Sequence, residues 1–218
     1  SALAREYIRI DAPNLRGTRL LFGDLLDNGT LQMIIGKENH VDICQDGQIL
    51  YSVTEFQGNV TSLAIGDLTG DFRPELVVGT DNAGALYIFE YKDDQWVRIG
   101  NPKYLWSPVT YLQVADINGD GWGDIVTLNS QGEARIYLSW QGELYKFYRS
   151  AEQVRFIQAA DLTGDGSDEI VIAKPQGYIG VMKWQDDQLE TIWENFPWGG
   201  INGMMIAEIN RNSLPEMM

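Results

Sequence analysis

Short apolar runs alternate with polar turns along this chain, and one arrangement of them recurs at nearly constant spacing. The first apolar run of the unit occurs at residues 18–22, 60–65, 109–114 and 154–159, with a fifth version at 203–207. The second run occurs at residues 33–35, 76–78, 125–128 and 170–172. Because the second runs are continuously apolar, we predict that they form central strands buried on both faces.

Each unit then closes with a hairpin. Residue types that favour tight turns occur at 45–47, 92–94, 141–142 and 185–187, so two further strands are expected around each turn. No segment shows a helical period. Equivalent positions are 43 to 49 residues apart, a spacing typical of propeller blades with about four short strands each.

The pattern therefore predicts an all-β fold, a β-propeller of four-stranded blades, as a single domain over residues 1–218. Four full blades are expected at 17–57, 58–105, 106–149 and 150–197, followed by a partial blade at 198–218. Segment 1–12 contains Glu6–Ile10, which resembles the fourth strand of a blade but is not preceded by the first three strands. We expect it to be a closing strand that completes the partial blade and protects its edge. Because residue 218 falls inside a repeat, the chain is expected to be a processed or excised piece, either an incomplete five-blade ring or part of a protein with more blades.

A nine-residue acidic loop joins the first two strands of each unit, and we name the loops by their first residues, 24, 67, 116, 161 and 208. Calcium takes six to eight oxygen ligands, which alternate residues of a short loop can supply. The expected ligands are Asp116, Asn118, Asp120, the Trp122 carbonyl and Asp124 in the 116 loop; Asp161, Thr163, Asp165, the Ser167 carbonyl and Glu169 in the 161 loop; and Asp67, Thr69, Asp71, the Arg73 carbonyl and Glu75 in the 67 loop. Two to three Ca²⁺ sites are therefore predicted.

The remaining loops are weaker candidates. The 24 loop has Leu26 and Gln32 at ligand positions and is expected to be empty, whereas the 208 loop offers Glu208, Asn210, Asn212 and Glu216. Loops rich in Asp, Asn and Gly also form turns without metal, but that alternative does not explain why carboxylates recur in register. An EF-hand or dockerin would need a helix after the loop, where this chain continues with a strand.

Composition excludes several classes of ligand and metal site. The formal charge is −15, and an acidic chain without a Lys/Arg cluster is a poor match for nucleic acid or an anionic membrane surface. Cys44 is the single cysteine and His40 the single histidine, which excludes an internal disulfide and a multi-histidine metal site. No apolar run is long enough to cross a membrane, so no direct membrane insertion is expected, and no signal peptide is evident.

The repeats resemble the FG-GAP and VCBS-type propeller family, which includes the integrin α-chain head and many bacterial surface proteins. The residues that carry the resemblance are 115–121 with Asp124, 160–166 with Glu169, and 66–71 with Glu75. The resemblance implies that these loops bind calcium within each blade. The Phe-Gly and Gly-Ala-Pro marks of integrin repeats are not reproduced in register, which favours the broader bacterial branch over an integrin-like partner.

The expected function is a noncatalytic, calcium-stabilised binding module for adhesion, assembly or protein–protein interaction, with a protein or glycan ligand on a loop face. Millimolar extracellular calcium would saturate even weak sites, which favours an extracellular or cell-surface setting. The first alternative is a carbohydrate-binding propeller, prompted by seven tryptophans and ten tyrosines. The second is a polysaccharide lyase-type enzyme, for which no catalytic constellation is evident.

Individual aromatic residues bear on the carbohydrate alternative. Tyr91, Trp140 and Trp184 are placed at one hairpin position in successive blades, which indicates repeated core packing. The candidates for an exposed aromatic surface are residues that do not recur at this position: Trp106, Trp193, Trp198 and segment 196–200. His40 is expected at the surface, and Cys44 is expected to be packed rather than reactive.

Overall fold

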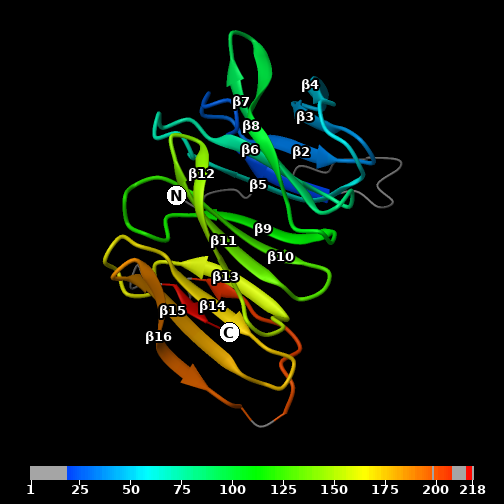
Figure 1. Cartoon of the computed structure of the whole chain (residues 1–218). Helices are drawn as coiled ribbons and strands as arrows, with labels where there is room; N and C mark the ends of the chain where they lie inside the picture. The colour runs from blue at the N-terminus through cyan, green and yellow to red at the C-terminus, as the bar shows by residue number, and fades with distance from the viewer. Residues whose placement is uncertain (1–18, 198, 208–214, 218) are drawn as a thin grey trace, which may run out of the picture.

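The computed structural model describes residues 19–197, 199–207 and 215–217. Within them the chain forms four antiparallel four-stranded sheets and one two-stranded sheet, and no described residue is helical. Each four-stranded sheet is built from consecutive strands in chain order, which is the topology of a propeller blade. The sheets follow one another as a fan of blades (Figure 1). The predicted all-β propeller with four full blades is confirmed.

The first sheet contains β1 Arg19–Gly23, β2 Gln32–Gly36, β3 Val41–Gln45 and β4 Gln48–Val53, and the second contains β5 Val60–Gly66, β6 Glu75–Thr80, β7 Ala85–Lys92 and β8 Gln95–Tyr104. The third contains β9 Val109–Ala115, β10 Asp124–Asn129, β11 Ala134–Trp140 and β12 Glu143–Arg149. The fourth contains β13 Phe156–Ala160, β14 Glu169–Ala173, β15 Ile179–Gln185 and β16 Gln188–Asn195. The two-stranded sheet pairs β17 Ile206–Ala207 with β18 Glu216–Met217.

Strand β17 is shorter than the run predicted at 203–207, and it pairs with β18 in a two-stranded antiparallel sheet, so the partial fifth blade stays a prediction. The predicted closing strand Glu6–Ile10 lies outside the described residues, as do Glu208, Asn210 and Asn212 of the 208 loop.

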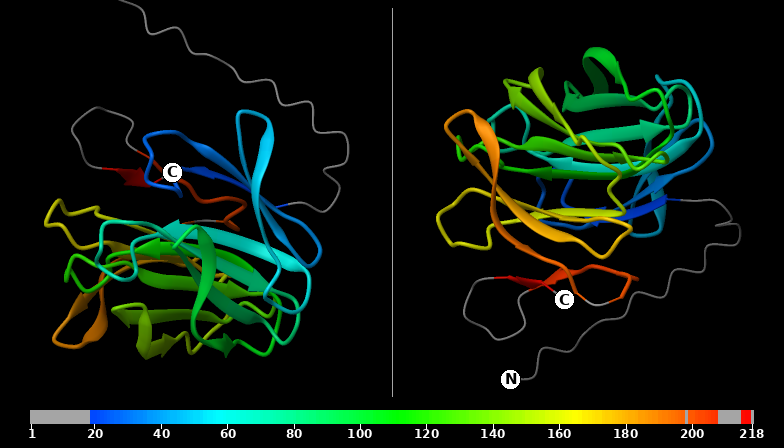
Figure 2. Two further views of the ribbon diagram at one scale, coloured as in Figure 1. Left: turned by 90° about the horizontal axis from the view of Figure 1, so that it is seen from above. Right: turned by 60° about the horizontal axis from the view of Figure 1, so that its bottom comes forward.

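The second strand of each blade is the most buried element, as its apolar sequence predicts. Every residue of β6 and of β10 is buried. Successive strand residues point to opposite faces, so Leu76 and Val78 join the core shared with the first blade, whereas Val77 joins the core shared with the third. The cores therefore lie between blades, and the first strands β1, β5, β9 and β13 pack side by side (Figure 2).

Each hairpin turn is a two-residue loop with positive φ at both central positions. The turns are Asp46-Gly47, Asp93-Asp94, Gln141-Gly142 and Asp186-Asp187, with φ between 48° and 77°. This backbone matches the type I′ turns that suit the twist of antiparallel strands. Because the first and third strands of a blade run in the same direction, the acidic loops and the hairpins emerge at one edge, which we call the loop edge.

Candidate calcium-binding loops

The closing residue of each acidic loop is a buried polar side chain that fixes the start of the same loop. Its side-chain oxygen accepts a hydrogen bond from the backbone N–H of the second loop residue in all four blades. The donor–acceptor distances are 2.7 Å for Leu25 to Gln32, 2.7 Å for Leu68 to Glu75, 3.0 Å for Ile117 to Asp124 and 2.8 Å for Leu162 to Glu169. None of these four closing residues is more than 2% exposed. They hold one backbone frame in every blade.

The first residue of each loop completes this frame. The Asp116 carboxylate accepts hydrogen bonds from the backbone N–H groups of Gly119, Asp120 and Gly121 at 2.8–3.1 Å. Asp24, Asp67 and Asp161 accept from equivalent N–H groups. The fourth and sixth loop positions have positive φ in every blade, a conformation that favours glycine. Phe72 occupies the sixth position of the 67 loop with a φ of 66°, so this loop keeps its shape without the glycine.

Neighbouring loops are hydrogen-bonded to one another through the eighth position. The N–H of Gly123 donates to the Asp67 carbonyl at 2.6 Å, and the N–H of Asp168 donates to the Asp116 carbonyl at 2.7 Å. Trp122 also covers Gly70, where a Cβ atom would lie 2.5 Å from the indole nitrogen. The eighth position of the 67 loop is Pro74, which has no N–H. The 67, 116 and 161 loops therefore form one connected row.

The 67 loop gathers carboxylates without a paired cation. Glu75 is buried, and burial, with the nearby charges of Asp67 and Asp71, raises its pKa to about 7. A cavity of about 200 Å³ beside it is lined by Asp71, Glu75 and Glu90, together with Arg73. No ion pair among the described residues involves a carboxylate of this loop. Hard oxygen donors around such a space suit Ca²⁺.

The 116 loop has the same electrostatic character. Asp124 is fully buried, and burial is the main reason why its pKa rises to about 7, with the charges of Asp120 and Asp116 adding to the effect. Burial likewise raises the pKa of Asp116. No Lys or Arg of the described chain forms an ion pair with these carboxylates. Asn118 and Asp120 lie beside each other, with an amide-to-carboxylate distance of 2.9 Å.

The 24 loop replaces the closing carboxylate with an amide. The Gln32 side chain is fully buried, and its Nε2 donates to the Asn28 side chain at 3.1 Å, the Thr30 carbonyl at 2.6 Å and the Gln45 side chain at 3.0 Å. A hydrogen-bond donor thus occupies the centre of this loop, and the absence of calcium there stays a prediction.

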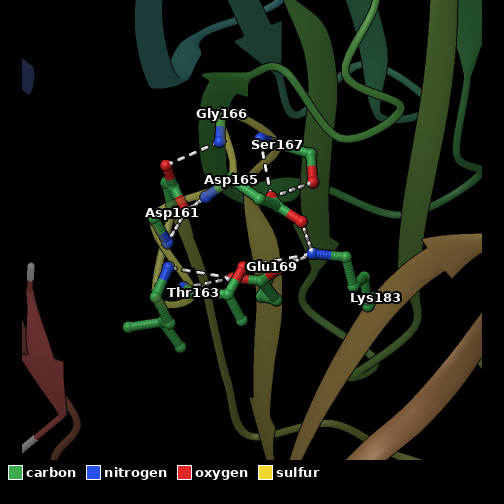
Figure 3. Close-up of polar contacts among 9 residues, drawn as sticks. Asp161, Thr163, Asp165, Gly166, Ser167, Glu169 and Lys183 are labelled. Carbon is green, nitrogen blue, oxygen red and sulfur yellow. Dashed lines mark hydrogen bonds and ion pairs between the residues drawn. The ribbon is translucent and has the colours of Figure 1, made fainter.

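The 161 loop has an ammonium group at its centre (Figure 3). Lys183 of β15 donates to Glu169 Oε1 at 2.7 Å and to Thr163 Oγ1 at 3.1 Å, and it forms an ion pair with Asp165. The hydrogen bond from Lys183 is the largest reason why the pKa of Asp165 lies below its ordinary value. The structure therefore brings Thr163, Asp165 and Glu169 together around one cation of the chain itself.

The sequence analysis missed Lys183 and Glu90, because both lie on third strands far from the loops in sequence. Among the described residues, no group of three or more His, Cys, Asp or Glu side chains is arranged to hold a metal ion as the loops stand. Several loop carboxylates are turned onto backbone N–H groups instead, so calcium binding would require the side chains to turn inward. The calcium sites remain a prediction.

One aromatic prediction was wrong. Trp140 was placed at the hairpin position of Tyr91 and Trp184, but it pairs with Glu143 directly beside the turn, and Ser139 takes the packed position. A shift of one residue moves a side chain to the other face of a strand. Trp140 is therefore 54% exposed and lies against Trp122 in a tilted pair with a ring-centre distance of 4.3 Å. Tyr91 and Trp184 instead pack on Tyr51 and Tyr148.

The aromatic residues predicted at the surface are exposed where the structure describes them. Trp106 is 77% exposed, and Trp193 and Phe196 are also exposed, whereas Trp198 lies outside the described residues. Cys44 is buried, as predicted. His40 is only partly exposed, and its Nε2 lies 3.5 Å from the buried Asp42 carboxylate.

Comparison with known proteins agrees with the class that the blades and loops define, a β-propeller built from repeats with acidic loops. The FG-GAP-like repeat family model matches residues 67–127 and 116–172. The matched segments contain the 67, 116 and 161 loops. Residues 67–172 of the chain therefore consist of FG-GAP-like repeats.

Solved structures share the fold at low sequence identity. Two crystal structures of BBS1N in complex with ARL6DN, soaked with lead and with mercury, match at 11% and 12% identity with TM-scores of 0.62 and 0.64. Both matches cover 91% of this chain, and they cover 72% and 58% of the other chain. The β-propeller domain of Myceliophteria thermophila Cps50 (Swd1) matches at 12% identity and a TM-score of 0.60, covering 87% of this chain and 58% of that domain. No curated protein matches the sequence.

Proposed function

We propose that the chain is a noncatalytic propeller module that binds a protein partner at its loop edge and is stabilised there by calcium in two to three acidic loops. The observation that carries the calcium proposal is the pair of buried closing carboxylates, Glu75 and Asp124, which face further acidic residues without a paired cation. A divalent cation would relieve the cost of burying these charges. The 67 and 116 loops are the first candidates.

Calcium would then act on more than one blade. The Gly123-to-Asp67 and Asp168-to-Asp116 hydrogen bonds join consecutive loops, so an ion that fixes one loop also restrains its neighbour. In this role the ion is structural, and the residues that would hold it are those of the loops themselves. Chemistry at the metal is not part of the proposal.

The test is a titration of calcium into chelator-stripped protein by calorimetry, with thermal unfolding measured in parallel. A ligand bound only by the native state adds about 2.7 kcal/mol to the free energy of unfolding at one hundred times its Kd. We expect heat of binding and a higher melting temperature, and loss of one site in the Asp124→Asn variant. Magnesium, which demands a smaller octahedral site, is the control ion. No heat and no stabilisation would contradict the calcium proposal.

The partner surface is proposed at the loop edge because aromatic side chains are exposed there. Phe72 is 90% exposed and lies two residues beyond Gly70, which Trp122 covers. Tyr145 is 58% exposed and lies beside Asn118 of the 116 loop. Aromatic residues are enriched at protein interfaces. One of the structural neighbours, BBS1N, was crystallised in complex with ARL6DN, which supports a protein partner.

A matched pair of tryptophan variants tests this surface. Trp106 is also exposed, but it lies between β8 and β9, at the edge opposite to the loops. We expect Trp140→Ala to lose a partner captured from cell-surface extracts and Trp106→Ala to retain it. Equal capture by the two variants would contradict a loop-edge site.

The exposed Trp140 beside Trp122 also gives a specific reason to test the carbohydrate alternative, since exposed aromatic rings can stack on sugar rings. A glycan array probed with the wild type and Trp140→Ala would separate the two ligand classes. The described residues contain no helix able to span a bilayer. A cell-surface or secreted setting is part of the proposal, since calcium there would fill weak sites.

A further inference from the structure

The contacts of Lys183 match the ligand positions of a calcium loop. Its Nζ atom reaches the side chains of Thr163, Asp165 and Glu169, which are the third, fifth and ninth residues of the 161 loop. The Lys183 side chain is only 14% exposed and the Glu169 side chain is fully buried. Two further elements of the blade, β14 and β15, therefore hold the ammonium group against the loop (Figure 3).

The ammonium group leaves no room for a second cation in this arrangement. An ammonium has three N–H donors, and three loop oxygens accept them. Calcium would need six to eight oxygens, including the same three, and would meet a positive charge at hydrogen-bond distance from them. To bind, it would first have to displace a largely buried lysine.

The other blades place different residues at the position of Lys183. Lys183 lies one residue beyond Met182, the partner of Ile170 across the sheet. By the same register, the matching residues are Gln45, Glu90 and Leu138 in the first three blades. Gln45 accepts from the Gln32 amide, Glu90 adds a carboxylate to the cavity beside Glu75, and Leu138 brings no charge. Within the described sheets, a lysine stands opposite the closing carboxylate in the fourth blade alone.

We propose that Lys183 serves as a built-in cation of the 161 loop, so that this loop keeps its shape without metal. Calcium binding in the described row is then confined to the 67 and 116 loops. The contrast with those two loops rests on the proposed function, whereas the role of Lys183 rests on its own contacts. This assigns Thr163, Asp165 and Glu169 to an internal ion-pair cluster instead of a calcium site.

The test compares calcium stoichiometry and thermal unfolding for Lys183→Met and for Lys174→Met, both starting from chelator-stripped protein. Lys174 is a matched control in the same blade, since it forms a 2.6 Å ion pair with Glu152 away from the loop. We expect Lys183→Met to melt below Lys174→Met in chelator, to bind one more calcium ion than the wild type, and to recover its melting temperature when calcium is added.

A second pair of variants keeps the proposal testable if Lys183→Met does not fold. Asp165→Asn should leave the number of calcium ions bound by the wild type unchanged, whereas Asp120→Asn, at the same position of the 116 loop, should lower it by one. A loss of one site in Asp165→Asn, or no gain in Lys183→Met, would overturn the role of Lys183. A wild type that binds no calcium would instead contradict the proposed function, and a site gained in Lys183→Met would still support the built-in cation.

Discussion

Removing the side chain of Asp168 is expected to loosen the junction between the 116 and 161 loops. Its Oδ2 atom accepts a hydrogen bond of 2.9 Å from the backbone N–H of Asp116, beside the 2.7 Å bond that its own N–H donates to the Asp116 carbonyl. The Asp168→Ala variant leaves the part-buried N–H of Asp116 without its acceptor. Asp168→Asn keeps a carbonyl oxygen in the same place and removes only the charge.

The free energies of unfolding of the two variants should therefore differ by the contribution of one hydrogen bond. A neutral hydrogen bond contributes about 0.5–1.5 kcal/mol and an unpaired buried N–H costs about 1–3 kcal/mol, so we expect Asp168→Ala to be about 1–2 kcal/mol less stable than Asp168→Asn. That difference corresponds to about 2–8 °C in Tm for a domain of this size. Asp168→Asn should be at least as stable as the wild type, because burial and the charges of neighbouring acidic residues raise the pKa of Asp168.

Urea unfolding and thermal unfolding, followed by circular dichroism in chelator, measure these differences without a contribution from metal. Glu190→Ala, at an exposed position of β16 in the same blade, controls for the loss of a carboxylate far from the junction. If Asp168→Ala and Asp168→Asn were equally stable, the side-chain hydrogen bond between the loops would have no energetic role.

Three further changes test other parts of the fold. Leu76→Ala in the core between the first two blades is expected to cost about 2–5 kcal/mol in the free energy of unfolding, whereas Leu31→Ala, at a residue that is 68% exposed, should change it by less than about 0.5 kcal/mol. Phe72→Gly should raise the free energy of unfolding by up to about 1 kcal/mol, because glycine relieves the strain of a positive φ at an exposed side chain. Phe72→Ala should give no such gain, and denaturant titration of both variants measures the difference. Burial alone would raise the pKa of Asp42, but hydrogen bonds from Lys37 and Ser52 hold this pKa below its ordinary value. The stability advantage over Asp42→Asn, about 1.5–3 kcal/mol, should therefore be complete above about pH 4 and be lost as the pH falls through the folded-state pKa, as a pH series of unfolding curves would show.

Much of the fold could be predicted because its signals are local. A continuous apolar run such as 76–78 identifies a central strand, and a pair such as Asp46-Gly47 identifies a hairpin, without knowledge of any distant residue. Trp140 marks the limit of this reasoning. The turn at 141–142 was predicted correctly, but Gln141 was equated with Gln185, which precedes its turn. Trp140 was therefore equated with Trp184, although it pairs beside the turn as Gln185 does.

The acidic loops mark a second limit, because their sequences resemble one another more than their surroundings do. The 116 and 161 loops share the same backbone bonds and nearly the same ligand positions. What distinguishes them is the residue that the third strand places opposite the closing carboxylate, Leu138 in one blade and Lys183 in the other. That residue lies 14 positions beyond the closing one in both blades, and its relation to the loop appears only when the sheet register is known. A buried carboxylate must be paired in some way, so a blade that carries a lysine at this position has its counter-charge in the chain, and a blade that carries an apolar or acidic residue there must take it from the solvent. On this argument the third strand, and not the loop motif, would determine which repeats of this propeller take up the calcium that we propose.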